Sequence, residues 1–323
     1  MKHLLRRGGF YLVALWASIT INFFIPRLIP GDPASILLSR FQGKMNPNAI
    51  HALQLQFGIS NDPLWLQYIQ YLGNLFHSNL GISFTYFPTP VATVIGEEIP
   101  WTLTLVGLSV VISFALGTML GIITAWKRGS FLDGIVPPIL TFFSSIPYFW
   151  LALIILYIFG YLLNLFPLNG GYDIGVTIGW NTNFILSAIQ HAILPASTIV
   201  LASIAGWMLG MRNTMITTLT EDYVLLAEAK GLSEKRIMYA YAARNAILPN
   251  VTAFALSLGF VVGGSLLTEV VFSYPGIGFA LLQAAQNSDY PLLQGIFLFI
   301  AIAVIGANFI ADLAYTLLDP RVR

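Results

Sequence analysis

Six long, mostly apolar stretches of this chain contain no Asp, Glu, Lys or Arg, and they constrain the fold more than any other feature. A helix that crosses the hydrocarbon layer of a membrane needs about 20 mostly apolar residues. The stretches therefore favour membrane-spanning helices over the shorter helices of a soluble core. They are residues 8–26, 99–126, 134–172, 174–211, 245–268 and 290–311.

The two longest stretches could in principle hold two spans each. Both contain a polar, turn-rich segment, at residues 164–171 and 179–191, so we predict one span per stretch with a loop between the two spans. The sequence thus predicts an all-α polytopic membrane protein with six transmembrane helices. Their expected ranges are 9–29, 101–124, 135–163, 192–212, 250–272 and 291–317.

The composition supports lipid as the main solvent of this chain. Hydrophobic residues make up 57% of the sequence and charged residues only 9%, whereas about 25% of the residues of a soluble domain are charged. Cysteine is absent, so the chain has no disulfides and no cysteine-based metal site. The net charge of +1 and the scattered basic residues do not favour nucleic-acid binding.

The basic residues predict the orientation, because Lys and Arg are enriched in cytoplasmic loops. With the N-terminus inside, 12 of the 15 Lys and Arg residues are cytoplasmic, and only Arg27, Arg40 and Lys44 are outside. Both termini are then cytoplasmic. No small-residue cleavage pattern follows the first apolar run, so we expect it to remain as the first span.

These spans divide the chain into three regions. Residues 1–30 form an N-terminal tail and the first transmembrane helix, and residues 31–98 form an external region with an amphipathic helical pattern. We expect this external region to be a cap on the membrane surface, and a role in receiving a partner is an equal alternative. Residues 99–323 form a core of five helices with a cytoplasmic loop at 212–249.

The loop 212–249 is predicted to form two short helices. Thr220 is expected to cap the first, with Glu221 and Asp222 in its first turn, and Gly231 to end it in a left-handed conformation. Ser233 is expected to cap the second helix, which runs to about residue 246. The small residues at the tip, Ala227, Ala229 and Gly231, permit close approach by another protein.

Leu225 to Gly231, with Ile247-Leu248-Pro249 behind it, resembles the "EAA" loop of bacterial ATP-binding-cassette importer permeases. The loop departs from the general form, because Leu225 and Leu226 stand where Glu and Ala are usual and Gly231 lies further from the proline. That departure is itself similar to the dipeptide/oligopeptide/nickel branch, and the chain looks like the first of the two permeases of such systems. Residues 29–33, 68–84, 268–278, 289–291 and 319–321 agree with the same branch, in order.

The resemblance implies the permease fold of a type I importer in the bacterial plasma membrane. A second homologous permease would complete the pathway, two ATPase subunits would bind ATP and Mg²⁺, and an external binding protein would deliver solute. The chain has no G-x-x-x-x-G-K-[ST] phosphate loop. We therefore expect a non-catalytic subunit that binds no cofactor of its own.

The resemblance also implies two groups of functional residues. Loop 212–249 would couple the permease to an ATPase, and the end of the fifth span would contribute to an outer gate. The coupling candidates are Asp222, Tyr223, Ala227, Glu228, Ala229, Lys230, Gly231 and Arg236. The gate candidates are Glu269, Phe272, Tyr274, Pro275 and Gly276.

Simpler interpretations stand beside these. The simpler interpretation of loop 212–249 is a basic cytoplasmic loop without a coupling role. The simpler interpretation of Glu269 is a residue at a helix end that contacts the turn 273–276. Asp312 fits pairing with a neighbouring helix better than carrying a proton. The glycine pairs 117/121, 206/210 and 259/263 are typical of helix packing, and Pro137, Pro138 and Pro147 are expected to kink the third span.

Two other classes of transport protein are less well supported. A secondary transporter would need ionisable residues near the membrane midplane, and a channel would need a filter-like sequence. The four histidines, His3, His51, His77 and His191, show no metal-ligand spacing. We predict peptides as the solute and oligosaccharides as the second choice, while the lack of clustered His, Met or Cys argues against nickel.

Overall fold

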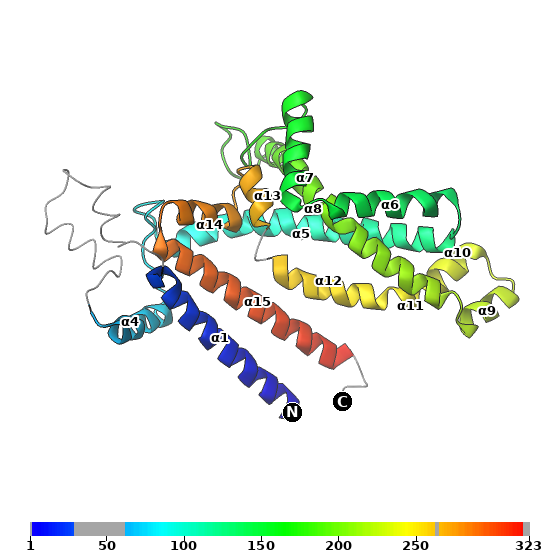
Figure 1. Cartoon of the computed structure of the whole chain (residues 1–323), viewed down its shortest axis with the longest axis horizontal. Helices are drawn as coiled ribbons and strands as arrows, with labels where there is room; N and C mark the ends of the chain where they lie inside the picture. Colours follow the sequence, from blue (N-terminus) through cyan, green and yellow to red (C-terminus); the bar gives the residue numbers. More distant parts are fainter. Residues whose placement is uncertain (1, 29–61, 262–264, 319–323) are drawn as a thin grey trace. The chain divides into compact units, whose positions relative to one another are not determined.

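The computed structural model describes residues 2–28, 62–261 and 265–318, and these residues are mostly helical (Figure 1). Residues 31–61 of the external region 31–98, and Gly263 of the pair 259/263, lie outside the described residues. The chain packs as two units, Met1–Trp101 with Gly276–Arg323, and Thr102–Pro275. These units group residues by packing, whereas the ranges 1–30, 31–98 and 99–323 divide the chain by predicted membrane side.

The first unit combines both ends of the chain. Its helices are α1 (Lys2–Leu28), α4 (Leu64–Phe76), the start of α5 (Val91–Trp126), α14 (Ile277–Gln286) and α15 (Tyr290–Leu318). Helices α1 and α15 contact each other along their lengths, as Figure 1 shows. A core of aliphatic side chains joins the start of α5 to α14 and α15, and it includes Val91, Ile95, Ile277, Leu292 and Ile296.

Asp289 fixes the start of α15 within this unit. Its buried carboxylate accepts hydrogen bonds from the Leu292 amide (3.1 Å), the Ser83 hydroxyl (2.5 Å) and the Thr85 amide (2.8 Å). The first of these bonds caps the helix, because the amides of a helix's first turn have no partner inside the helix. The other two attach the segment before α5 to the same point.

The second unit contains the rest of α5 and the central helices. It comprises α6 (Phe131–Ser145), α7 (Tyr148–Ile155), the π-helix η1 (Leu156–Leu162), α8 (Thr182–Thr218), α9 (Asp222–Ala229), α10 (Glu234–Arg236), the π-helix η2 (Ile237–Ala243), α11 (Arg244–Ala246), α12 (Leu248–Val261) and α13 (Leu266–Val271). Helix α8 contacts α6, α7, α12 and α13, so it is the central support of this unit.

Two glycines allow α5 and α8 to approach closely. A Cβ atom at Gly117 would lie 2.7 Å from the Ile204 carbonyl oxygen, and one at Gly121 would lie 2.5 Å from the Met208 carbonyl oxygen. The predicted pair 117/121 therefore packs against a helix of its own chain. Of the second pair, Gly210 faces the Asn250 side chain, whereas Gly206 has no neighbour within 4 Å of such an atom.

The predicted spans agree best with the structure at α1 and α15. Helix α5 begins at Val91 rather than at residue 101, because the helix continues through Glu97, Glu98 and Pro100, which the prediction placed outside it. Four described helices are long and apolar enough to cross a membrane, namely α1, α5, α8 and α15. Helix α8 begins at Thr182 rather than at residue 192, because the Asn181 side chain accepts a hydrogen bond from the Phe184 amide and caps the helix there. The count of six spans and the cytoplasmic position of both termini stay predictions.

The third predicted span, 135–163, is not one straight helix. Helix α6 ends at Ser145, and the following helix from Tyr148 to Leu162 is turned by 101°. Pro147 explains the break, since a proline disfavours the helical conformation in the residue before it, and Ile146 is extended. Pro137 and Pro138, which we expected to kink the span as well, lie inside α6 without ending it.

The fifth predicted span, 250–272, is also not continuous. Among the described residues, α12 runs from Leu248 to Val261, and α13 begins at Leu266 as a separate helix of six residues. Ser265, the residue before α13, has a non-helical backbone conformation. Of the predicted gate candidates, Glu269 therefore lies within a short helix, and Phe272, Tyr274, Pro275 and Gly276 follow it.

Candidate functional site

Residues 219–247 of the predicted loop 212–249 form a compact stub of two short helical segments at one end of α8 (Figure 1), whereas residues 212–218 continue α8. Helix α9 is the first segment. The second is a continuous helical stretch made of α10, η2 and α11, which begins after Ser233 and ends at Ala246, as predicted. Ser233 occupies the N-cap position of this stretch, but it does not make the expected side-chain capping hydrogen bond. The two-helix prediction for this loop is confirmed.

The predicted start of α9 is wrong by one residue. Glu221 occupies the N-cap position, and it makes no side-chain capping hydrogen bond. The Thr220 hydroxyl instead donates to the Thr217 carbonyl oxygen (2.8 Å), which belongs to the last turn of α8. Threonine side chains can bond to a preceding turn as readily as they cap a following one, and here the preceding turn prevails.

Gly231 ends α9 as predicted. Its φ angle is +70°, in the left-handed region that favours glycine. The Gly231 amide donates to the Glu228 carbonyl oxygen (2.9 Å) and the Leu232 amide donates to the Ala227 carbonyl oxygen (3.3 Å). This pair of bonds is the Schellman motif. A Cβ atom at Gly231 would meet no neighbour within 4 Å, so the backbone conformation is what favours glycine here.

The stub packs firmly on the ends of the long helices. Val224 and Ala227 of α9 are buried together with Ile237 and the alanines of η2 and α11. These side chains lie against Ile122 and Ala125 of α5 and against Met211 and Met215 of α8. Burial of this apolar surface makes the stub an extension of α5 and α8 rather than a loose loop.

Seven of the eight coupling candidates are exposed. They are Asp222, Tyr223, Glu228, Ala229, Lys230, Gly231 and Arg236. The exception is Ala227, which is only 2% exposed and faces the core of the stub. The small size of Ala227 therefore serves packing within the chain, and among the three small tip residues only Ala229 and Gly231 are open to a partner.

Two adjacent leucines form an exposed apolar patch on α9. Leu225 is 50% exposed and Leu226 is 55% exposed, and Tyr223 beside them is partly open. If α9 lies outside the membrane, as the predicted topology places it, such a patch marks a surface that another protein covers more readily than one that faces water. These leucines are the positions at which the loop departs from the general form of the EAA loop.

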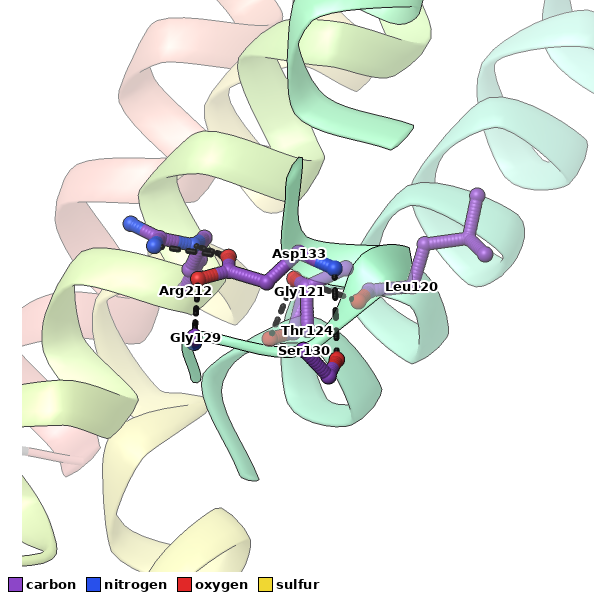
Figure 2. Close-up of polar contacts among 7 residues, drawn as sticks. All are labelled: Leu120, Gly121, Thr124, Gly129, Ser130, Asp133 and Arg212. Atoms are coloured by element: carbon purple, nitrogen blue, oxygen red, sulfur yellow. Dashed lines mark hydrogen bonds and ion pairs between the residues drawn. The ribbon is translucent and has the colours of Figure 1, made fainter. Parts of the chain in front are cut away.

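Asp133 and Arg212 form an ion pair at the base of the stub (Figure 2). The guanidinium of Arg212 donates to one carboxylate oxygen, Oδ1, through Nη2 (2.7 Å) and Nε (2.8 Å). The Gly129 amide donates to the other oxygen, Oδ2, at 3.0 Å. The pair joins the first turn of α6 to α8, six residues before α8 ends at Thr218.

Sequence reasoning missed this ion pair. Arg212 was counted only among the basic residues of the predicted cytoplasmic side, and no role was assigned to Asp133. A signal was present, because Asp133 immediately precedes the charge-free stretch 134–172 and Arg212 immediately follows the stretch 174–211. Two opposite charges at the same end of two adjacent spans are expected at the same depth, where they can pair.

The gate candidates lie around a tight turn after α13. Glu269 is fully buried, and its Oε1 accepts a hydrogen bond from the Thr102 hydroxyl at 3.1 Å. The Tyr274 amide donates to the Glu269 backbone carbonyl (2.8 Å), which closes the turn. Burial, and then the charge of Glu269, raise the pKa of the Tyr274 phenol.

The remaining gate candidates, Phe272, Pro275 and Gly276, lie in the same turn or directly after it. Phe272 is buried, and its carbonyl oxygen accepts a hydrogen bond from the Gly170 amide (3.0 Å) of the loop before α8. Pro275 is partly buried and ends the second unit, while Gly276 precedes α14 in the first unit. The structure thus brings Glu269, Phe272 and Tyr274 together in one unit.

The loop before α8 is fastened by Asp173. The Ser187 hydroxyl donates to the Asp173 carboxylate (2.6 Å), and the Asp173 amide donates back to the Ser187 oxygen (2.7 Å). His191, which lies one turn further along α8, has its Nε2 3.9 Å from the same carboxylate. These contacts hold the loop on α8, and Gly170 links it to the turn after α13.

The fold and the stub define a class of protein: a multi-pass membrane component with a helical surface built on the ends of its spanning helices. Residues 117–323 match the family of binding-protein-dependent transport system inner membrane components. The chain belongs to this family, and it is a multi-pass inner-membrane protein with the type I ATP-binding-cassette permease fold.

Relatives match along the whole chain. It is 36% identical to the di/tripeptide transport system permease protein DppB of Pseudomonas aeruginosa, over 100% of this chain and 99% of that protein. It is 32% identical to the dipeptide transport system permease protein DppB of Lactococcus lactis, over 100% and 99%. It is also 32% identical to the oligopeptide transport system permease protein AppB of Bacillus subtilis, over 99% and 98%.

Proposed function

We propose that this chain is the membrane permease subunit of an ATP-driven importer, and that it forms half of the pathway for di- and oligopeptides delivered by an external binding protein. The relatives named for di/tripeptide, dipeptide and oligopeptide transport support the choice of solute. The observation that carries the mechanism is the stub, which has a packed core and an exposed apolar patch at Leu225 and Leu226.

The proposed machine has parts that this chain does not supply. A second homologous permease completes the pathway, and two ATPase subunits bind ATP and Mg²⁺. The absence of a phosphate loop from the sequence supports this division of labour. The exposed leucines of α9 dock into a groove of one ATPase, while Asp222, Glu228, Lys230 and Arg236 contribute charges around them.

A continuous set of packed elements supports transmission from the stub to the turn after α13. The stub is packed on α8, and the Asp133–Arg212 pair fastens α6 to α8 near the same end. The Ser144 hydroxyl at the other end of α6 donates to the Leu201 carbonyl oxygen of α8 (3.3 Å). After the 101° bend, α7 contacts α13, which carries Glu269.

A displacement of the stub would therefore move α8 and α6 together and shift α7 against α13. Packed elements of this kind move as bodies rather than deform, which is the usual basis of alternating access. Glu269, Phe272, Tyr274, Pro275 and Gly276 are the part of the chain that such a movement would open or close.

The test is transport by the complete machine in vesicles. The chain is reconstituted with its second permease, its ATPases and its binding protein, and uptake of a radiolabelled dipeptide is measured with ATP, without ATP, and with an imposed ion gradient alone. We expect uptake only with ATP. Uptake driven by the gradient alone would contradict the proposal, and ATP-dependent uptake of an oligosaccharide without any peptide uptake would overturn its substrate.

A further inference from the structure

Helix α4 (Leu64–Phe76) has a surface that the proposed function does not use. Its sequence contains no charged residue. At 100° per residue, Trp65, Ile69, Leu72 and Phe76 fall on one stripe of the helix, and Gln70 and Asn74 fall on the opposite side. Trp65 is 65% exposed, Ile69 56% and Phe76 89%, so the described residues leave most of the apolar stripe uncovered.

A third face of α4 is anchored to α1. The Tyr68 hydroxyl lies 2.8 Å from the Thr20 hydroxyl, and the Asn22 side chain donates to the Tyr71 hydroxyl (3.4 Å). Phe23, which is fully buried, packs its ring against the rings of both tyrosines. The two faces of α4 that remain open are therefore the apolar stripe and the polar side.

These contacts fix the depth of α4 relative to a spanning helix of the same unit. The apolar window of α1 runs from Gly8 to Ile25, and Thr20, Asn22 and Phe23 lie in its last two turns. Figure 1 shows α4 beside this C-terminal end of α1. Helix α4 thus lies where the hydrocarbon layer around α1 ends and the headgroup region begins.

We propose that α4 is an interfacial helix that inserts its apolar stripe into the lipid of the outer leaflet beside α1. Trp and Tyr are enriched at this depth in membrane proteins, because their rings have an apolar body and a polar edge. A helix with one apolar and one polar face, held parallel to the membrane, buries the apolar face at the headgroup boundary. Because α4 has no charge, the insertion depends on apolar burial and not on anionic lipid.

The chain has no cysteine, so single-cysteine variants need no prior substitution. Ile69→Cys and Phe76→Cys place a spin label on the apolar stripe, and Asn74→Cys places the matched control label on the polar side. Each full-length variant is reconstituted in phosphatidylcholine vesicles. Collision of the label with oxygen, which concentrates in lipid, and with a water-soluble nickel chelate is then measured.

We expect oxygen to dominate at positions 69 and 76 and the nickel chelate to dominate at position 74. Labels at 69 and 76 as accessible to nickel as the label at 74 would overturn the proposal, because the stripe would face water. Shielding of 69 and 76 from both reagents would also overturn it, because a second copy of the chain would then cover the stripe.

Vesicles with added phosphatidylglycerol test the source of the attraction. We expect the same accessibilities as in phosphatidylcholine, because α4 has no basic residue. Insertion that occurs only with the anionic lipid would contradict an uncharged apolar anchor. Monodisperse elution of each labelled variant before reconstitution establishes that it is folded.

Discussion

The backbone conformation of Gly231 determines how α9, which carries the proposed docking surface, is oriented. A residue with φ near +70° costs an L-amino acid roughly 1–2 kcal/mol relative to glycine. The two hydrogen bonds of the Schellman motif turn the chain between α9 and Ser233, and so determine how α9 is presented. The sequence predicted this conformation, because Gly after a helical pattern is a strong end signal.

Gly231→Val should uncouple ATP hydrolysis from peptide uptake in the reconstituted importer. A β-branched residue disfavours the left-handed conformation, so the turn would rearrange and α9 would be displaced. The measurement is the amount of peptide taken up per ATP hydrolysed. Gly231→Asn is the matched control, since asparagine tolerates this conformation best among the other residues. Unchanged coupling in the valine variant would show that the turn has no role in presenting α9.

The Asp133–Arg212 pair should contribute measurably to stability, because both side chains are mostly buried. Asp133→Ala leaves the Arg212 guanidinium without its carboxylate, and loss of a charge-assisted hydrogen bond costs about 1.5–3 kcal/mol. Thermal unfolding in detergent should show a lower midpoint for this variant. Glu228→Ala, at an exposed position, should leave the midpoint unchanged. Equal midpoints for the two variants would mean that the pair adds nothing to stability.

Helices show most clearly what the sequence can and cannot predict. Charge-free stretches report which residues lipid surrounds, so the positions of α1 and α15 and most of α5 followed from them. The same stretches do not predict where the backbone bends. All three prolines of the third span were expected to kink it, yet only Pro147 breaks it, because Pro137 and Pro138 lie inside a helix that continues through them. The non-helical conformation at Ser265, between α12 and α13, has no charge or proline beside it that would predict it.

The close approach of α5 and α8 leads to a test with an internal control. Replacing glycine by alanine inside a helix normally stabilises it by about 1 kcal/mol. At Gly121 we expect the opposite sign, because the added methyl group would lie 2.5 Å from a backbone carbonyl oxygen that cannot move aside cheaply. Gly206→Ala on the exposed side of α8 should be neutral or stabilising.

Thermal unfolding of the two alanine variants in the same detergent gives this comparison directly. A lower midpoint for Gly121→Ala than for Gly206→Ala is the expected result. Equal midpoints for both variants would contradict this expectation. They would mean that α5 and α8 can move apart to accommodate a methyl group, so that the close contact at Gly117 and Gly121 is not required for the stability of the second unit.

Two independent properties of the whole chain indicate a membrane component of a transport system. Its apolar stretches require lipid, and the loop that is predicted to be cytoplasmic folds into a packed stub with an exposed apolar patch. The class and family followed from the sequence, since both depend on patterns along the chain. The contact of Thr102 with Glu269 did not, because no local pattern pairs these residues, whereas the Asp133–Arg212 pair could have been inferred from the position of both charges at the ends of charge-free stretches.

The central claim is that the stub docks on an ATPase subunit, and cross-linking tests it most directly. Leu226→Cys is placed on the exposed patch of α9, and Trp180→Cys, at a fully exposed position of the loop before α8, is the control. Each variant is treated with a thiol-reactive cross-linker in membranes that contain the whole transporter, and the adducts are identified by mass spectrometry. We predict an adduct with an ATPase subunit from position 226 and none from position 180. No ATPase adduct from position 226, in a transporter that still imports peptide, would contradict the account.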